Sequence, residues 1–156
     1  MRGKKIRKRK LNPDPKYHSV TVEKFINKIM LRGQKETARK LVYRALDILK
    51  EKTGKEPLEV FEGAIKNTSP LLEVRPRRIG GATYQVPTEV SAARRETLAM
   101  RWLIKASRSR QGATFDKILS EEILAAFQNT GVAIKQKENI HKMAEANKAF
   151  AHYARF

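Results

Sequence analysis

Residues 72–87 read Leu-Glu-Val-Arg-Pro-Arg-Arg-Ile-Gly-Gly-Ala-Thr-Tyr-Gln-Val-Pro. Two extended runs flank the pair Gly80-Gly81, which tolerates positive φ and predicts the tight or bulged turn of a β-hairpin. Pro76 and Pro87 each lack a backbone N–H, so the strands are expected to form a free-standing ribbon rather than the middle of a sheet. An isolated hairpin is marginally stable, so this one is expected to lean on another surface. We therefore predict a hairpin over residues 71–88.

Three helices are predicted before the hairpin. The first begins with Thr21 as its N-cap, because apolar residues then recur at the i, i+3, i+4, i+7, i+8 spacing of one buried helix face. The same spacing predicts a second helix over residues 34–52, and Pro57 and Pro70 bound a short third helix. The apolar positions of the first helix are Val22, Phe25, Ile26, Ile29 and Met30.

Three further helices are predicted after the hairpin. Ser91 or Thr88 caps a fourth helix that runs to about Ser107, and Thr114 caps a fifth that ends near Gly131. A sixth runs from about Val132 to Ala149, before a tail over residues 149–156. The predicted fold is therefore all-α: a bundle of about six helices with a hairpin arm protruding between the third and fourth. At 156 residues, the chain is expected to form a single domain, 1–156.

The charge balance predicts a polyanionic partner. The chain has 34 Lys and Arg against 16 Asp and Glu, a net charge of +18, and its pI is near 10.4. Such an excess favours nucleic acid first and an acidic membrane surface second. Cysteine is absent, so disulfides, thiolate nucleophiles and Cys-based metal sites are excluded, which suits a reducing cytoplasm. The longest stretch without charge, residues 123–134, is too short to span a membrane.

The positive charge is concentrated in the first two-thirds of the chain. Residues 1–110 carry 28 basic and 11 acidic residues, a net +17, whereas residues 111–156 carry 6 and 5, a net +1. The excess begins in an arm over residues 1–18, which we expect to be extended and, over its first ten residues, disordered through charge repulsion. These charges indicate a polyanionic ligand without specifying which kind, and the residues that carry them are Arg2, Lys4, Lys5, Arg7, Lys8, Arg9 and Lys10.

The predicted fourth helix has one basic face. At about 100° per residue, Arg94, Arg101, Lys105 and Arg108 lie within roughly 60° of one another. A solvated surface would explain such a stripe equally well. However, Glu96 is the only acid between Val90 and Gln111, so few local partners neutralise these cations and an outside anion is favoured. The opposite face, which is expected to pack inward, consists of Ala92, Ala99, Leu103 and Ala106.

The hairpin carries a second group of candidates. Arg75, Arg77 and Arg78 lie on its first strand, and Tyr84 on its second offers a platform for base stacking. The alternative is that the arginines only prevent strand-to-strand aggregation at an exposed edge. In the tail, Phe150 or Tyr153 is expected to pack under the bundle, with nucleotide stacking as the alternative.

Catalytic and cofactor motifs are missing. Gly54-Lys55 lacks the other positions of a phosphate-binding loop, and Gly80-Gly81 does not extend to a dinucleotide fingerprint. His141 and Glu145 stand four residues apart on a predicted helix, but no third metal ligand accompanies them. We therefore expect a protein that is not an enzyme and that needs no cofactor or metal.

Five stretches of the chain match the pattern of a known family: residues 11–17, 24–33, 73–87, 95–109 and 143–153. Over these stretches, which span nearly the whole chain, the sequence resembles the bacterial small-subunit ribosomal protein S-seven family. Two positions depart from its pattern: Gln34 replaces the usual Lys of Gly-Lys-Lys or Gly-Lys-Arg, and the end Tyr153-Ala154-Arg155-Phe156 replaces Tyr-Arg-Trp.

The resemblance implies a helical domain with a hairpin arm that binds the 3′ major domain of small-subunit ribosomal RNA and nucleates assembly of the subunit head, on cytoplasmic ribosomes. It also implies that hairpin and C-terminal regions lie near exit-site transfer RNA and the messenger path, with the proteins S-eleven and S-nine as neighbours. Some family members repress translation of their own operon messenger. RNA-facing roles carry over to the arm, Lys35, the hairpin arginines, Arg94 and Arg95.

Two other classes of function remain open from the residues. A DNA-architectural or helix-turn-helix regulator would account for the charge count, and competition between duplex DNA and ribosomal RNA separates the two readings. An RNA-modifying enzyme is a more distant alternative, because the sequence offers no nucleophile, cofactor loop or metal set.

Overall fold

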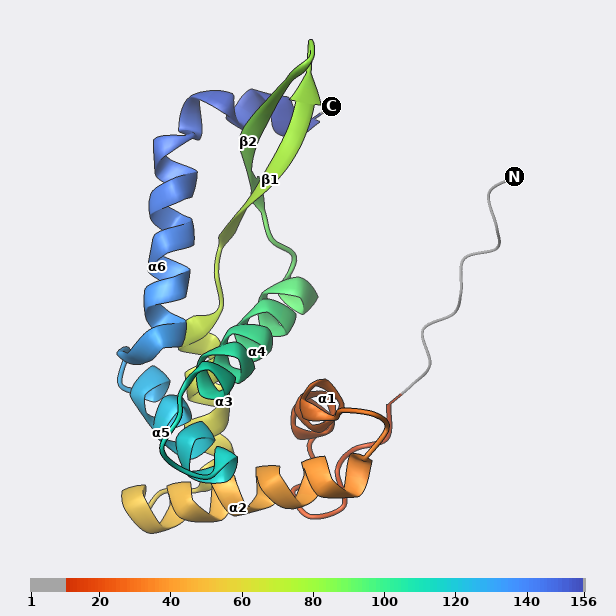
Figure 1. The fold of residues 1–156 in the computed structure, drawn as a ribbon, viewed down its shortest axis with the longest axis vertical. Helices are drawn as coiled ribbons and strands as arrows, with labels where there is room; N and C mark the ends of the chain where they lie inside the picture. The colour runs from red at the N-terminus through yellow and green to blue at the C-terminus, as the bar shows by residue number, and fades with distance from the viewer. Residues whose placement is uncertain (1–10, 156) are drawn as a thin grey trace, which may run out of the picture. The chain divides into compact units, whose positions relative to one another are not determined.

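The computed structural model describes residues 11–155, without the side chains of residues 154 and 155 (Figure 1). It confirms the all-α class and the hairpin between the third and fourth helices, and it adds a terminal 3-10 helix, η1, that the sequence did not predict. The chain divides into two compact units, the first ending at Lys40 and the second beginning at Leu41. The elements are α1 Val20–Ile29, α2 Lys35–Thr53, α3 Pro57–Thr68, β1 Leu72–Ile79, β2 Ala82–Glu89, α4 Ala92–Ser109, α5 Phe115–Phe127, α6 Gly131–Ala146 and η1 Lys148–Arg155.

In the first unit, α1 begins earlier than predicted. Its N-cap is Ser19, whose Oγ accepts the N–H of Val22 at 3.5 Å, so the assignment of Thr21 was wrong. The reason lies upstream: buried Asp14 accepts the N–H groups of Lys16 and Tyr17, both at 3.0 Å, and closes a turn that brings Ser19 to the helix start. The chain is therefore not simply extended up to residue 18.

The predicted apolar face of α1 is confirmed. Val22, Phe25, Ile26 and Ile29 are buried, and all four follow the helical spacing. Helix α2 starts within the first unit and continues into the second. In its part beyond residue 40 the buried positions again keep that spacing, at Val42, Ala45, Leu46 and Leu49.

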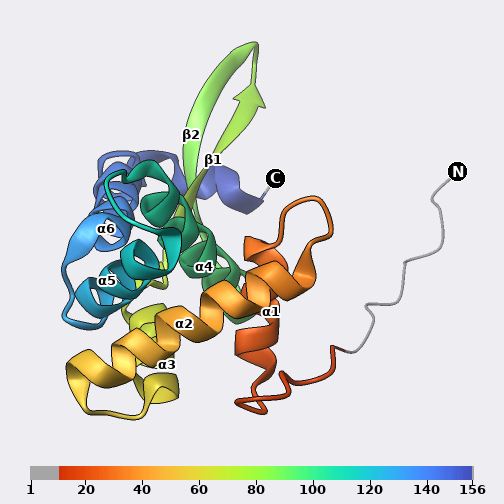
Figure 2. The same ribbon diagram turned by 60° about the horizontal axis from the view of Figure 1, so that its bottom comes forward.

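The core of the second unit is built from α3, α4 and α5 (Figure 2). Phe61 of α3, Leu103 of α4 and Leu119 of α5 are each at most 1% exposed. The side-chain amide of Asn67 at the end of α3 donates to the last carbonyls of α5, at 3.2 Å to Ala126 and 2.9 Å to Phe127. Apolar burial and this polar clamp together fix the helix from which the hairpin starts.

Helix α5 is shorter than predicted. It stops at Phe127 instead of continuing to Gly131, because Asn129 adopts a left-handed conformation with φ 57°. The N–H of Thr130 then donates to the carbonyl of Ala125 at 2.8 Å, which closes a C-terminal capping turn. Asparagine tolerates this conformation better than most residues, so the stop signal was Asn129 rather than a glycine.

The turn of the hairpin is a two-residue loop made of the Gly-Gly pair. Ile79 pairs with Ala82, so Gly80 and Gly81 alone form the loop, with φ values of 55° and 88°. Positive φ at both central positions is the geometry of a type I′ turn, whose twist matches that of the strands. The two strands pair antiparallel without a bulge from Leu72 to Glu89.

The chain itself supports the hairpin. Helix α6 packs along β1, and η1 packs against β2, as Figure 1 shows for the blue end of the chain beside the green strands. Residue Val86 of β2 is fully buried as a result. The expectation of a ribbon outside any larger sheet is confirmed, because the described strands form a sheet of β1 and β2 alone, and the surface on which this ribbon leans is provided by α6 and η1. Helix α6 ends at Ala146 rather than Ala149, where the 3-10 helix takes over.

Candidate nucleic-acid interface

All three candidate arginines of the hairpin are exposed. Arg75, Arg77 and Arg78 lie on β1, where Arg77 pairs with Tyr84 and Arg78 with Thr83. Since alternate residues of a strand point to opposite faces, Arg75 and Arg77 share one face and Arg78 takes the other. The described interactions give Arg77 and Arg78 no protein partner, so their guanidinium groups are open to an external anion.

The predicted basic face of α4 is also exposed. Arg94, Arg101, Lys105 and Arg108 all lie at the surface. On the opposite face, Ala99, Leu103 and Ala106 are buried as expected, but Ala92 is exposed because it is the first residue of the helix and extends beyond the packed layer. The helix therefore presents a row of cations while its other side forms part of the core.

Buried Glu73 joins the hairpin to α4. Its Oε1 and Oε2 accept Arg94 Nε at 3.0 and 2.8 Å, and its Oε1 also accepts Arg75. Sequence reasoning missed this link because it looked for acids only along α4, whereas Glu73 lies 21 residues before Arg94. Two of the predicted RNA-binding arginines thus share one carboxylate. Arg95 lies next to them and donates from Nε to the carbonyl of Val90 at 2.8 Å.

The first unit contains a second buried glutamate paired with a candidate cation. Glu23 of α1 is 5% exposed, and its Oε1 pairs with the ammonium of Lys35 at the start of α2. The second oxygen of Glu23 is buried without a hydrogen-bond partner among the described residues. Lys35 remains partly exposed, with 39% of its side chain accessible.

Tyr84 and the tail form an aromatic cluster on the hairpin. The ring of Tyr84 lies 5.1 Å from that of Phe150 and 5.8 Å from that of Tyr153, centroid to centroid. The expectation that Phe150 or Tyr153 packs under the helical bundle is therefore wrong: both pack against the hairpin instead. The sequence did contain a signal for this contact. Tyr84, Phe150 and Tyr153 lie on the hairpin and the tail, two segments outside the helical core.

The candidate residues of the arm, Arg2 to Lys10, lie outside the described residues. Of the remaining candidates, Lys35 lies in the first unit and the cations of the hairpin and of α4 lie in the second, where Glu73 brings Arg75 and Arg94 together. A groove of about 430 Å³ lies between α4 and α6. It is lined by Leu98 and Trp102 of α4 and by Ile140 and Met143 of α6.

The described residues contain no cluster of side chains suited to a metal ion. Among residues 11–155, no group of three or more His, Asp or Glu side chains could hold a metal ion. His141 accepts the N–H of Leu71 at 3.2 Å, and burial together with the neighbouring Lys137 lowers its pKa below 6.5. Its role is thus structural, at the base of the hairpin. Over the same residues, the structure offers no helix that is long and apolar enough to cross a bilayer.

Comparison with known proteins shows which family the sequence resembles. The sequence profile of the family described as ribosomal protein S7p/S5e matches residues 1–148. "Small ribosomal subunit protein uS7" of Thermotoga petrophila is 58% identical over 153 residues, covering 98% of this chain and 99% of the relative. The proteins of the same name from Thermomicrobium roseum and Dictyoglomus turgidum are 56% identical over 152 residues and 58% over 145, covering 97% and 93% of both chains in each pair.

The match extends over both units, the hairpin and α6, and it agrees with the resemblance carried by five stretches of the sequence, among them the hairpin at residues 73–87. The chain therefore belongs to the ribosomal protein S7p/S5e family.

Proposed function

We propose that the chain binds the 3′ major domain of small-subunit ribosomal RNA and nucleates assembly of the subunit head. As a member of this family it is a structural protein of the small ribosomal subunit in bacteria, and the family is one of ribosomal proteins rather than of enzymes. The observation that best supports the RNA contact is the exposed set of cations on β1 and α4, within a chain of net charge +18.

The chemistry of these cations suits folded RNA. A-form helices hide their base edges in a deep, narrow groove, so a protein recognises them mainly through phosphate positions and shape. Guanidinium groups bind phosphate oxygens in a bidentate manner, and a two-stranded arm can reach between helices at a junction. The hairpin arginines and the α4 cations would therefore contact different backbone segments of one RNA junction.

The proposal extends to the neighbours of the chain in the subunit. The hairpin and η1 would lie near exit-site transfer RNA and the messenger path, beside the proteins S-eleven and S-nine. The exposed hairpin tip and the aromatic cluster on β2 support contacts of this kind, because both lie outside the helical core. We further propose that the same cationic surface binds the messenger of its own operon, so that excess protein represses its translation.

The salt dependence of binding tests the main proposal. If about eight phosphates are neutralised, log K should fall with log salt at a slope of roughly −6 to −7 for a ribosomal RNA fragment that contains the 3′ major domain. A nearly salt-independent affinity would contradict the proposal. So would displacement of that RNA by duplex DNA at equal concentration, which would instead favour a DNA-architectural protein. Turnover of the RNA would indicate the enzymatic alternative.

A further inference from the structure

We propose that Glu73 is a positioning residue for RNA binding: it holds Arg75 of β1 and Arg94 of α4 together as a two-arginine clamp for one backbone phosphate. The inference rests on the proposed RNA-binding function and goes beyond it, because it assigns a role to an acid inside a cationic surface. An acidic residue at such a place would ordinarily oppose the binding of a polyanion.

The geometry leaves the outer edges of both arginines available. Arg94 binds Glu73 through Nε alone, at 3.0 Å from Oε1 and 2.8 Å from Oε2. Arg75 uses Nε and Nη2, both on Oε1. Both terminal nitrogens of Arg94 and Nη1 of Arg75 therefore have no acceptor among the described residues, while the shared oxygen keeps the two guanidinium groups close together.

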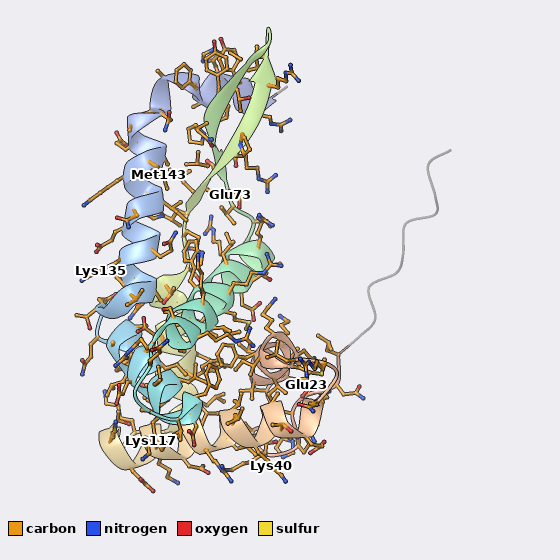
Figure 3. The ribbon with its side chains drawn as sticks, viewed as in Figure 1. Glu23, Lys40, Glu73, Lys117, Lys135 and Met143 are labelled. Carbon is orange, nitrogen blue, oxygen red and sulfur yellow. The ribbon has the colours of Figure 1, made fainter. Side chains whose placement is uncertain are left out.

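The accessible fractions of the three side chains indicate that Glu73 is fixed inside the protein and that Arg75 and Arg94 are available to a ligand. Only 9% of the Glu73 side chain is accessible, against 48% for Arg75 and 43% for Arg94. Figure 3 places Glu73 at the base of the hairpin, where the strands leave the helices. A buried carboxylate is stabilised only when it is paired, so the two arginines are held in place before any RNA arrives. Holding them in advance reduces the side-chain entropy that binding would otherwise cost.

The charges of the cluster are also consistent with an anionic ligand. Two guanidinium groups and one carboxylate give the cluster a net charge of +1. The carboxylate is buried, whereas the two arginine side chains that keep unpaired N–H groups are nearly half exposed. A phosphate would thus meet donors first, at a site that joins the hairpin to α4 and fixes the direction of the arm.

The direction in which one substitution changes the affinity for RNA distinguishes a positioning role of Glu73 from simple electrostatics. Glu73→Gln removes a negative charge, so Coulomb attraction alone predicts tighter binding to RNA. If Glu73 acts by orienting the arginines, the same change weakens binding, because the neutral amide holds them less firmly and its NH2 group repels their donors. A role limited to fold stability would lower the unfolding temperature and leave the affinity of the folded protein unchanged.

The experiment measures the affinity of the full chain for a ribosomal RNA fragment containing the 3′ major domain, at fixed salt and below the unfolding temperature of every variant. Glu73→Gln is expected to weaken binding about three- to tenfold, a part of what charge-assisted contacts contribute. The matched control is Glu89→Gln, which removes an exposed acid at the same end of the hairpin and should leave binding equal or tighter. In an Arg94→Gln background, Glu73→Gln should have little further effect.

Equal or tighter binding of folded Glu73→Gln would overturn the inference and leave the proposed function intact. If Glu73→Gln does not fold, Arg94→Lys replaces it, since lysine keeps the charge but loses the fork; unchanged affinity in that variant would likewise overturn the inference. Failure of the wild-type chain to prefer ribosomal RNA over duplex DNA would instead refute the proposed function, and the inference with it.

Discussion

The carboxylate of Glu122 on α5 accepts the backbone N–H of Ala133 at 2.8 Å and so caps the first turn of α6 from a neighbouring helix. Glu122 is 2% exposed. The first N–H groups of a helix have no partner within it, and the positive end of the helix dipole favours a carboxylate there. This contact holds the first turn of α6, and α6 in turn packs along β1 of the hairpin.

Replacing Glu122 with Ala should therefore destabilise the protein. The buried N–H of Ala133 would lose its acceptor, which costs about 1–3 kcal/mol, and a cavity would add to the loss. Urea denaturation followed by the fluorescence of Trp102, the only tryptophan, measures the change. Glu122→Gln serves as the control because it keeps an acceptor oxygen and should lose less. Equal stability of the Ala variant and the wild type would disprove the capping role.

Removing Arg77 and Arg78 together should weaken RNA binding without loss of fold. Both side chains are exposed and neither takes part in a described ion pair, so their replacement by Ala removes only contacts with the ligand. We expect about a tenfold loss of affinity per arginine that contacts a phosphate, with helical circular dichroism unchanged. Lys135→Ala with Lys142→Ala, on the exposed side of α6, removes the same charge and should have a much smaller effect. Similar losses in the two double variants would mean that net charge alone determines binding.

Substituting Tyr84 should release the 3-10 helix from the hairpin. The ring contacts of Tyr84 with Phe150 and Tyr153 contribute about 0.5–1.5 kcal/mol each. Hydrogen exchange in η1 should therefore be faster in Tyr84→Ala than in the wild type, while exchange in α3 and α5 stays the same. Tyr84→Phe keeps the ring and should retain slow exchange. The packing role would be refuted by exchange in η1 that is equally slow in the Ala variant.

Acidification should loosen the base of the hairpin through His141. Burial, with a smaller contribution from Lys137, lowers the pKa of His141 below 6.5, and only the neutral ring can accept the N–H of Leu71. Because the folded-state pKa is the lower one, this contribution is complete above pH 6.5 and is lost as the pH falls below it. Thermal unfolding from about pH 7.5 to 5 should show a smaller loss of stability in His141→Gln, which accepts the same bond without titrating. Parallel pH profiles for the two proteins would contradict this role.

Local signals predicted most of the fold. The spacing of Val22, Phe25, Ile26 and Ile29 predicted the buried face of α1, and Gly80-Gly81 predicted the hairpin turn to the residue. Both features depend on backbone preferences and on the period of the helix, which neighbouring residues determine. The helix ends were less accurate, because Asn129 and Ser19 act through a left-handed residue and a capping bond that periodicity does not reveal.

The long-range contacts could not be predicted from local patterns. Glu73 and Arg94 are 21 residues apart, and Tyr84 meets rings more than 60 residues away in the chain. Which acid pairs with which cation depends on how the hairpin leaves α3 and returns to α4. For the same reason, sequence reasoning identified Arg75 and Arg94 as candidates and found no sign of the carboxylate that holds them.

The two-residue loop at Gly80-Gly81 also gives the arm a fixed length. Eight residues on each strand, at about 3.3 Å per residue, carry the tip roughly 26 Å from the base of the hairpin, where the strands leave α3 and α4. Lengthening both strands by two residues would keep every side chain on its face and move the tip about 7 Å outward. Adding a single residue to one strand would instead reverse the faces beyond the insertion. The length of the arm can therefore change only in steps of two residues per strand if its side chains are to keep their faces.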